Sequence, residues 1–169
     1  MAMGRSTLPP KPPSAAERWF RLGADLARLG RYRDAIEPLE QALAYSVEEP
    51  GEGYHRALRS WYGLAVALAR GDVVRGRRLC EEAVADSPRD ADLYVNLCRV
   101  YMRSSRRDLS IEALKTALAF DPHHPSANSL MQELGQRSRP VFAFLDRRHP
   151  LNRYVGKIRH RLSSIRVGR

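Results

Sequence analysis

Residues 90–122, DADLYVNLCRVYMRSSRRDLSIEALKTALAFDP, carry the clearest structural signal in the chain. The end of this stretch repeats the end of the preceding one at a spacing of 34 residues, with Ala83 matching Ala117 and Pro88 matching Pro122. A constant period of this length is typical of proteins assembled from repeated helix pairs. The sequence therefore predicts an internal structural repeat.

A third copy lies earlier in the chain. Residues 16–43, AERWFRLGADLARLGRYRDAIEPLEQAL, show the same order of apolar, small and turn-forming residues. The copies lie near 16–49, 57–90 and 91–124. Ala42 and Ala83 are separated by 41 residues instead of 34, and the excess falls in the polar loop VEEPGEGYH, residues 47–55. We predict an all-α fold of three helix-turn-helix repeats.

The three copies resemble the tetratricopeptide repeat, in which W-x2-L-G-x2-Y in one helix precedes G-x-Y-x2-A-x3-F-x2-A and a closing proline. The matching residues of the first copy are Trp19, Leu22, Gly23, Leu26, Gly30, Tyr32, Ala35, Leu39, Ala42 and Leu43. Those of the second are Trp61, Leu64, Ala65, Leu68, Gly71, Val73, Gly76, Cys80, Ala83, Val84 and Pro88. Those of the third are Tyr94, Leu97, Cys98, Tyr101, Ser110, Leu114, Ala117, Leu118 and Pro122.

The resemblance implies an α-solenoid of stacked helix pairs. Small residues such as Gly23, Ala35 and Ala42 are expected where two helices cross closely, while aromatic and leucine side chains fill the space between successive pairs. The inter-helix turn of the second copy is one residue short. In the third copy Ser105 replaces the glycine and Arg107 the aromatic residue, which predicts a looser turn.

Helix-end signals agree with this organisation. Ser14 and Glu17 form a capping box, Asp90 caps the helix that opens the third copy, and a further helix runs from Pro125 to Gly135. We expect a Pro-rich leader without stable structure at 1–14, a repeat domain at 15–136 that ends in a capping helix at 125–136, and a basic extension at 137–169.

The resemblance also implies that the first helix of each pair lines a concave binding groove. Arg28, Arg70 and Arg103 are equivalent in the three copies, and a row of guanidinium groups beside apolar residues suits an acidic-hydrophobic peptide or helix. Alternatively, these arginines only end their helices and remain solvated. The predicted groove residues are Phe20, Arg28, Arg59, Tyr62, Val66, Arg70, Val95, Asn96, Arg99 and Arg103.

Some members of the family hold a partner's terminal carboxylate with lysine, asparagine and arginine side chains on the groove helices. At those positions this chain has Phe20, Ala24, Asp92 and Asn96. The sequence therefore disfavours binding of chaperone tails.

Residues 137–169 carry ten cations and one acid, whereas residues 15–136 carry 17 Lys and Arg against 18 Asp and Glu. Periodicity predicts a basic amphipathic helix from Pro150. It either packs on the repeats or contacts nucleic acid, an anionic membrane surface or an acidic protein. The predicted basic contact residues of this extension are Arg147, Arg148, Arg153, Lys157, Arg159 and Arg161.

No motif for catalysis, a metal or another cofactor occurs in the sequence. Cys80 and Cys98 fall on apolar helix faces, which favours buried thiols in a reducing cytoplasm. We expect a non-enzymatic cytoplasmic adaptor or scaffold that binds a protein partner. Two other functions remain open: a nucleic-acid or ribosome-associated factor acting through the basic extension, and a self-associating structural component.

Overall fold

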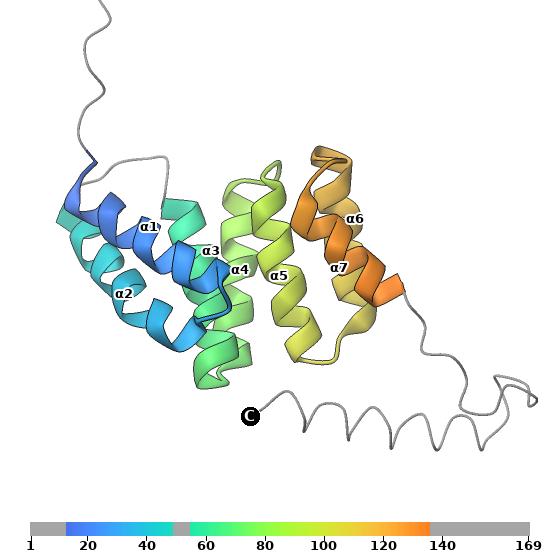
Figure 1. Cartoon of the computed structure of the whole chain (residues 1–169), viewed down its shortest axis with the longest axis horizontal. Coiled ribbons are helices and arrows are strands. Elements are labelled where there is room, and N and C mark those ends of the chain that lie inside the picture. The colour runs from blue at the N-terminus through green and yellow to red at the C-terminus, as the bar shows by residue number, and fades with distance from the viewer. Residues whose placement is uncertain (1–12, 49–54, 136–169) are drawn as a thin grey trace, which may run out of the picture. The chain divides into compact units, whose positions relative to one another are not determined.

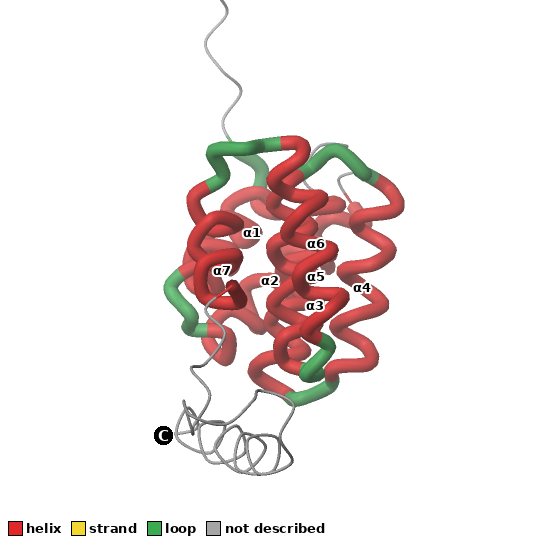
Figure 2. The backbone as a smooth tube through the Cα atoms, turned by 90° about the vertical axis from the view of Figure 1, so that its right-hand side faces the viewer, coloured by secondary structure: helices red, strands yellow, loops and turns green. Residues whose placement is uncertain are grey.

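The computed structural model describes residues 13–48 and 55–135, and these residues form helices joined by short turns (Figures 1 and 2). An all-α fold is therefore confirmed. The helices are α1 (Ala15–Arg28), α2 (Tyr32–Glu48), α3 (His55–Ala65) with its π-helical continuation η1 (Val66–Arg70), α4 (Val73–Asp86), α5 (Ala91–Arg103), α6 (Arg107–Phe120) and α7 (Pro125–Gly135).

The first six helices form three antiparallel pairs that follow one another in chain order (Figure 1). Contacts are densest within the pairs α1–α2, α3–α4 and α5–α6, and each second helix also packs on the first helix of the next pair. The first helices additionally touch along the array, α1 against α3 and α3 against α5. This is the arrangement expected of a helical solenoid.

Close crossing in the first pair depends on a small residue, as predicted. Gly23 of α1 is buried against α2, where an added Cβ atom would lie only 2.6 Å from Leu39 Cγ. Ala35 and Ala42 of α2 are fully buried. Larger side chains at these positions would force the two helices apart.

The second pair crosses at two glycines. A Cβ atom on Gly76 would lie 2.4 Å from the carbonyl oxygen of Gly63 and 2.6 Å from Ala67 Cβ. Only two residues, Gly71 and Asp72, connect η1 to α4, whereas three residues connect the helices of the first and third pairs. The shortened turn is thus confirmed. Gly63 was not expected at the crossing, although an apolar helix that retains a glycine in its interior is a signal for close contact.

The prediction of a looser turn in the third pair is wrong. Ser105 adopts φ 58°, the left-handed conformation that Gly30 adopts with φ 76° in the first pair. In both turns the left-handed residue donates its N–H to the carbonyl oxygen three residues earlier, Gly30 to Ala27 and Ser105 to Met102. The following residue donates its N–H to the carbonyl oxygen five residues earlier, at 2.9 Å in both turns. The paired hydrogen bonds hold the serine turn in the same geometry as the glycine turn.

The first helix also departs from expectation. Trp19 and Leu22 were predicted to fill the space between pairs, but they are 37 % and 47 % exposed. Their counterparts in α3, Trp61 and Leu64, are 4 % and 0 % exposed. The difference arises because no helix pair precedes α1 in the described part of the chain.

Two predicted N-caps are confirmed, although the Glu17 carboxylate of the predicted capping box pairs with Arg21. The Ser14 hydroxyl accepts a hydrogen bond from the Glu17 N–H, and the Asp90 carboxylate accepts one from the Asp92 N–H. The helix predicted at Pro125 to Gly135 is α7. Its N-terminus is capped by His124, whose Nδ1 accepts the Ala127 N–H at 3.2 Å. None of the helices in the described residues is long and apolar enough to cross a membrane.

Candidate protein-binding surface

Three arginines occupy the same place in successive pairs. Arg28, Arg70 and Arg103 each lie in the last turn of the first helix of a pair, and each is exposed. The fold therefore repeats a guanidinium group once per pair, along the edge where the first helices end. We call these three residues the arginine row.

Two members of the arginine row have partners within the protein. Arg28 lies 2.7 Å from the Asp25 carboxylate, and its Cζ atom stands 5.0 Å from the centre of the Trp61 ring. Arg70 lies 2.9 Å from Glu40. Arg103 makes no ion pair with any of the residues that the structure describes. Exposed ion pairs contribute at most about 1 kcal/mol, so an incoming carboxylate can replace Asp25 or Glu40 at little cost.

Glu40 connects α2 to α3 through two side chains. It accepts a hydrogen bond from the Tyr62 hydroxyl at 3.0 Å while it pairs with Arg70. Burial raises the pKa of Tyr62, and the hydrogen bond and negative charge of Glu40 raise it further. Tyr62 therefore stays a neutral donor that orients Glu40, and Glu40 in turn orients Arg70. Glu40 was not predicted from the sequence, since only the packing of α2 on α3 brings it to this edge.

Four predicted groove residues are not accessible. Tyr62, Val66, Val95 and Asn96 are 6 %, 1 %, 2 % and 1 % exposed, so the prediction that they line an open surface is wrong. The contacts of α1 with α3 and of α3 with α5 place them inside the packed array. Phe20 is half-buried.

Asn96 lies in the interior of the array. Its Nδ2 donates a hydrogen bond to the Ser60 hydroxyl of α3 at 3.2 Å. Its Oδ1 has no hydrogen-bond partner among the described residues. The side chain therefore joins α5 to α3, and it does not point toward solvent.

The remaining predicted arginines are half-buried. Arg59 lies 2.6 Å from Asp86 at the end of α4, so its charge is bound by the second helix of its own pair. Arg99 makes no ion pair within the described ranges. The predicted basic residues of the extension, Arg147, Arg148, Arg153, Lys157, Arg159 and Arg161, lie outside the residues that the structure describes.

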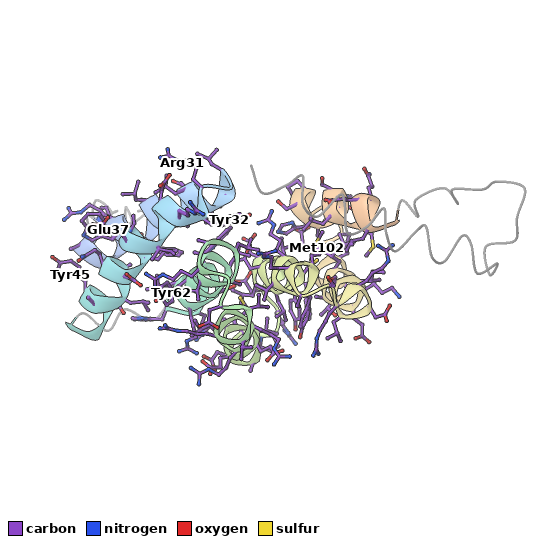
Figure 3. All side chains as sticks on the ribbon, turned by 90° about the horizontal axis from the view of Figure 1, so that it is seen from below. Arg31, Tyr32, Glu37, Tyr45, Tyr62 and Met102 are labelled. Carbon is purple, nitrogen blue, oxygen red and sulfur yellow. The ribbon has the colours of Figure 1, made fainter. Side chains whose placement is uncertain are left out.

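A surface cavity of about 360 Å³ opens between the α1–α2 turn and the end of η1, and its lining residues adjoin Arg28 and Arg70 in sequence. Leu68 and Ala69 contribute apolar atoms from the end of the α3–η1 helix, and the side chain of Arg31 is held by Asp34 at 2.7 Å. Figure 3 shows Arg31 and Tyr32 at the turn between α1 and α2. The cavity was not predicted from the sequence, because residues of two helix pairs line it. Its lining residues are Gly30, Arg31, Tyr32, Arg33, Asp34, Leu68 and Ala69.

The two cysteines are internal, as predicted. Cys80 and Cys98 are both 0 % exposed and unpaired. Desolvation raises the pKa of each thiol to about 12. Such thiols are poor nucleophiles near neutral pH.

The described architecture is similar to that of known repeat proteins. Residues 67–134 match the family model for the tetratricopeptide repeat. Over 115 residues, the chain is 27 % identical to interferon-induced protein with tetratricopeptide repeats 2 from Cricetulus griseus; the match covers 68 % of this chain and 23 % of the relative. The chain thus spans about a quarter of the length of that relative.

Solved structures share the fold. The first TPR domain of human RPAP3 superimposes with a TM-score of 0.57 at 16 % identity, covering 74 % of this chain and 93 % of that domain. The Arabidopsis OM64 TPR domain gives a TM-score of 0.55 at 14 % identity, covering 72 % and 94 %. The three helix pairs, the repeated small and aromatic positions and the family-model match over residues 67–134 support a tetratricopeptide-repeat fold for this chain.

Proposed function

We propose that this chain is a non-enzymatic, cytoplasmic protein-interaction adaptor that holds an acidic, partly apolar peptide or helix along the arginine row. The observation that carries the proposal is the recurrence of an exposed arginine at the end of the first helix in three successive pairs. Guanidinium groups bind carboxylates in a bidentate manner, so a repeating row selects a ligand with several acidic residues.

Apolar contacts for such a ligand come from the cavity beside the row. Tyr32, Leu68 and Ala69 line it and take the role first assigned to the buried Tyr62, Val66 and Val95. A peptide side chain inserted there would bring neighbouring carboxylates to the flanking arginines. Apolar anchors combined with charged pairs are typical of peptide recognition.

Structural relatives support an acidic ligand without identifying it. The first TPR of Spaghetti, at 16 % identity, was solved with the HSP90 peptide SRMEEVD, and the second TPR domain of human RPAP3, at 14 % identity, with the HSP70 peptide SGPTIEEVD. In this chain two positions of the terminal-carboxylate clamp, Ala24 and Asn96, are only 1 % exposed. We therefore propose an internal acidic segment as the ligand, in place of a chain terminus.

The test is selection from a displayed random-peptide library, followed by anisotropy titrations of the enriched peptides. We expect acidic-apolar peptides to be enriched and the Arg70→Glu/Arg103→Glu variant to bind them at least about 10-fold more weakly. The matched control is Arg56→Glu/Arg89→Glu, which reverses two exposed arginines near the starts of α3 and α5. Equal weakening in both variants, or no acidic enrichment, would show that the arginine row is not the binding site.

The charge of residues 137–169, ten cations against one acid, favours a second candidate function. We propose a polyanion contact, such as RNA, as the alternative role of this extension. Affinity capture with the full chain and with residues 1–136, with and without nuclease, separates the two functions. Nuclease-sensitive recovery that requires residues 137–169 would favour nucleic-acid binding over the adaptor.

A further inference from the structure

One apolar surface is not explained by peptide binding. Along α1 and its C-cap, Ala15, Trp19, Leu22, Leu26 and Leu29 follow one another at spacings of 4, 3, 4 and 3 residues. This spacing places them in a single stripe, which is the pattern of a coiled-coil seam. We call these five residues the α1 seam. Trp19, Leu22 and Leu29 are exposed, with Leu29 at 75 %, whereas Ala15 and Leu26 are half-buried and Leu26 packs against the core.

The seam lies on the outer face of the first pair. Trp19, Leu22 and Leu29 are three of the six large hydrophobic side chains that are exposed among the described residues, and Tyr45 of α2 is a fourth, at 39 %. Figure 3 shows Tyr45 at the edge of α2 that faces away from α3. Within the array the corresponding face of α3 is covered by the first pair, which is why Trp61 and Leu64 are buried.

We propose that the α1 seam binds the α1 seam of a second copy of this chain, with the two helices antiparallel about a two-fold axis. In this register Trp19 lies opposite Leu22 of the second copy, and Ala15 lies opposite Leu26. A small residue then faces a large one, so that side chains interdigitate. The macrodipoles of antiparallel helices also attract each other.

The charges beside the α1 seam favour a second copy of this chain as the partner. Arg18 and Asp25 each immediately precede a seam residue, so they lie along the same edge of the helix, seven residues apart. In the antiparallel dimer Arg18 of each copy faces Asp25 of the other, and symmetry forms the pair twice. Arg18 is exposed and makes no ion pair within residues 13–48 and 55–135, while Asp25 is 67 % exposed and pairs with Arg28. The surface is thus self-complementary in both shape and charge.

Sedimentation velocity of the full chain tests the proposal directly. We expect a reversible dimer of 19.2 kDa chains and at least about 100-fold weaker association for Leu22→Glu, which places a carboxylate in the seam of both copies. Val74→Glu is the matched control, since Val74 is a 73 % exposed apolar residue on α4. A wild-type chain that stays monomeric at about 100 μM, or Leu22→Glu that still dimerises, overturns the proposal.

A charge swap distinguishes the predicted register of the two helices from nonspecific hydrophobic association. Arg18→Asp alone and Asp25→Arg alone place like charges at both inter-copy pairs, so each should be monomeric. An equimolar mixture should dimerise again, because the two carboxylates of the first variant meet the two guanidinium groups of the second. Failure of the mixture to associate would refute the register. The Arg70→Glu/Arg103→Glu variant should remain dimeric, so this test is independent of peptide binding.

Discussion

Replacing Ser105 by glycine should stabilise the protein. Ser105 has φ 58° and occupies the turn position that glycine occupies in the first two pairs, with φ 76° at Gly30 and φ 75° at Gly71. The left-handed conformation costs a residue with a Cβ atom about 1–2 kcal/mol. Glycine removes that cost but gains about 0.5–1 kcal/mol of conformational freedom in the unfolded chain. The expected net gain in the free energy of unfolding is about 0.5–1 kcal/mol.

Urea denaturation followed by circular dichroism measures this change, at a constant m-value. Gly30→Ser is the reciprocal variant and should lose about the same amount, because an added Cβ atom at Gly30 meets nothing within 4 Å and only the backbone cost remains. The reasoning would be refuted if Ser105→Gly lowered the stability, or if Gly30→Ser left it unchanged. Either result would mean that the left-handed turn imposes no cost on a serine.

Two further predictions concern the interior of the array. Gly76→Ala should destabilise the protein by about 1–3 kcal/mol in urea denaturation because its Cβ would collide with Gly63, whereas Gly135→Ala, with no atom within 4 Å, should not. Burial raises the pKa of Cys80 and Cys98 from 9.0 to about 12, so between these values the unfolded thiols lose protons that the native thiols keep. The stability that comes from keeping these two thiols protonated is therefore fully present below about pH 9 and is lost as the pH rises toward 12. Urea denaturation at a series of pH values measures this loss. A free energy of unfolding that rose between pH 9 and 12 would contradict the prediction.

Much of the fold was predictable because its signals are local or periodic. The 34-residue period, the caps at Ser14 and Asp90, and the helix from Pro125 to Gly135 depend on residues that are close in sequence. The short connection of the second pair was also visible, since a missing residue shifts the alignment of the copies. These features require no knowledge of how the pairs pack.

The candidate site was less predictable than the fold. Counting along each first helix correctly identified the equivalent places of Arg28, Arg70 and Arg103, but it could not tell which neighbouring side chains are exposed. Val66 and Val95 follow the same periodicity as accessible residues and yet are buried. Their burial arises from contacts between first helices of successive pairs, which no single copy of the repeat contains.

The sequence by itself determined the helix pairs, their number and the residues that end and cap them, because backbone hydrogen bonds and amphipathic periodicity act over a few residues. Only the tertiary structure decided that Glu40 holds both Tyr62 and Arg70, that the Gly63–Gly76 crossing brings α3 and α4 together, and that Trp19, Leu22 and Leu29 of the α1 seam stay exposed. Each of these features depends on side chains far apart in sequence. Their distances are set by the stacking of whole helices, a property of the assembled array that no local pattern encodes.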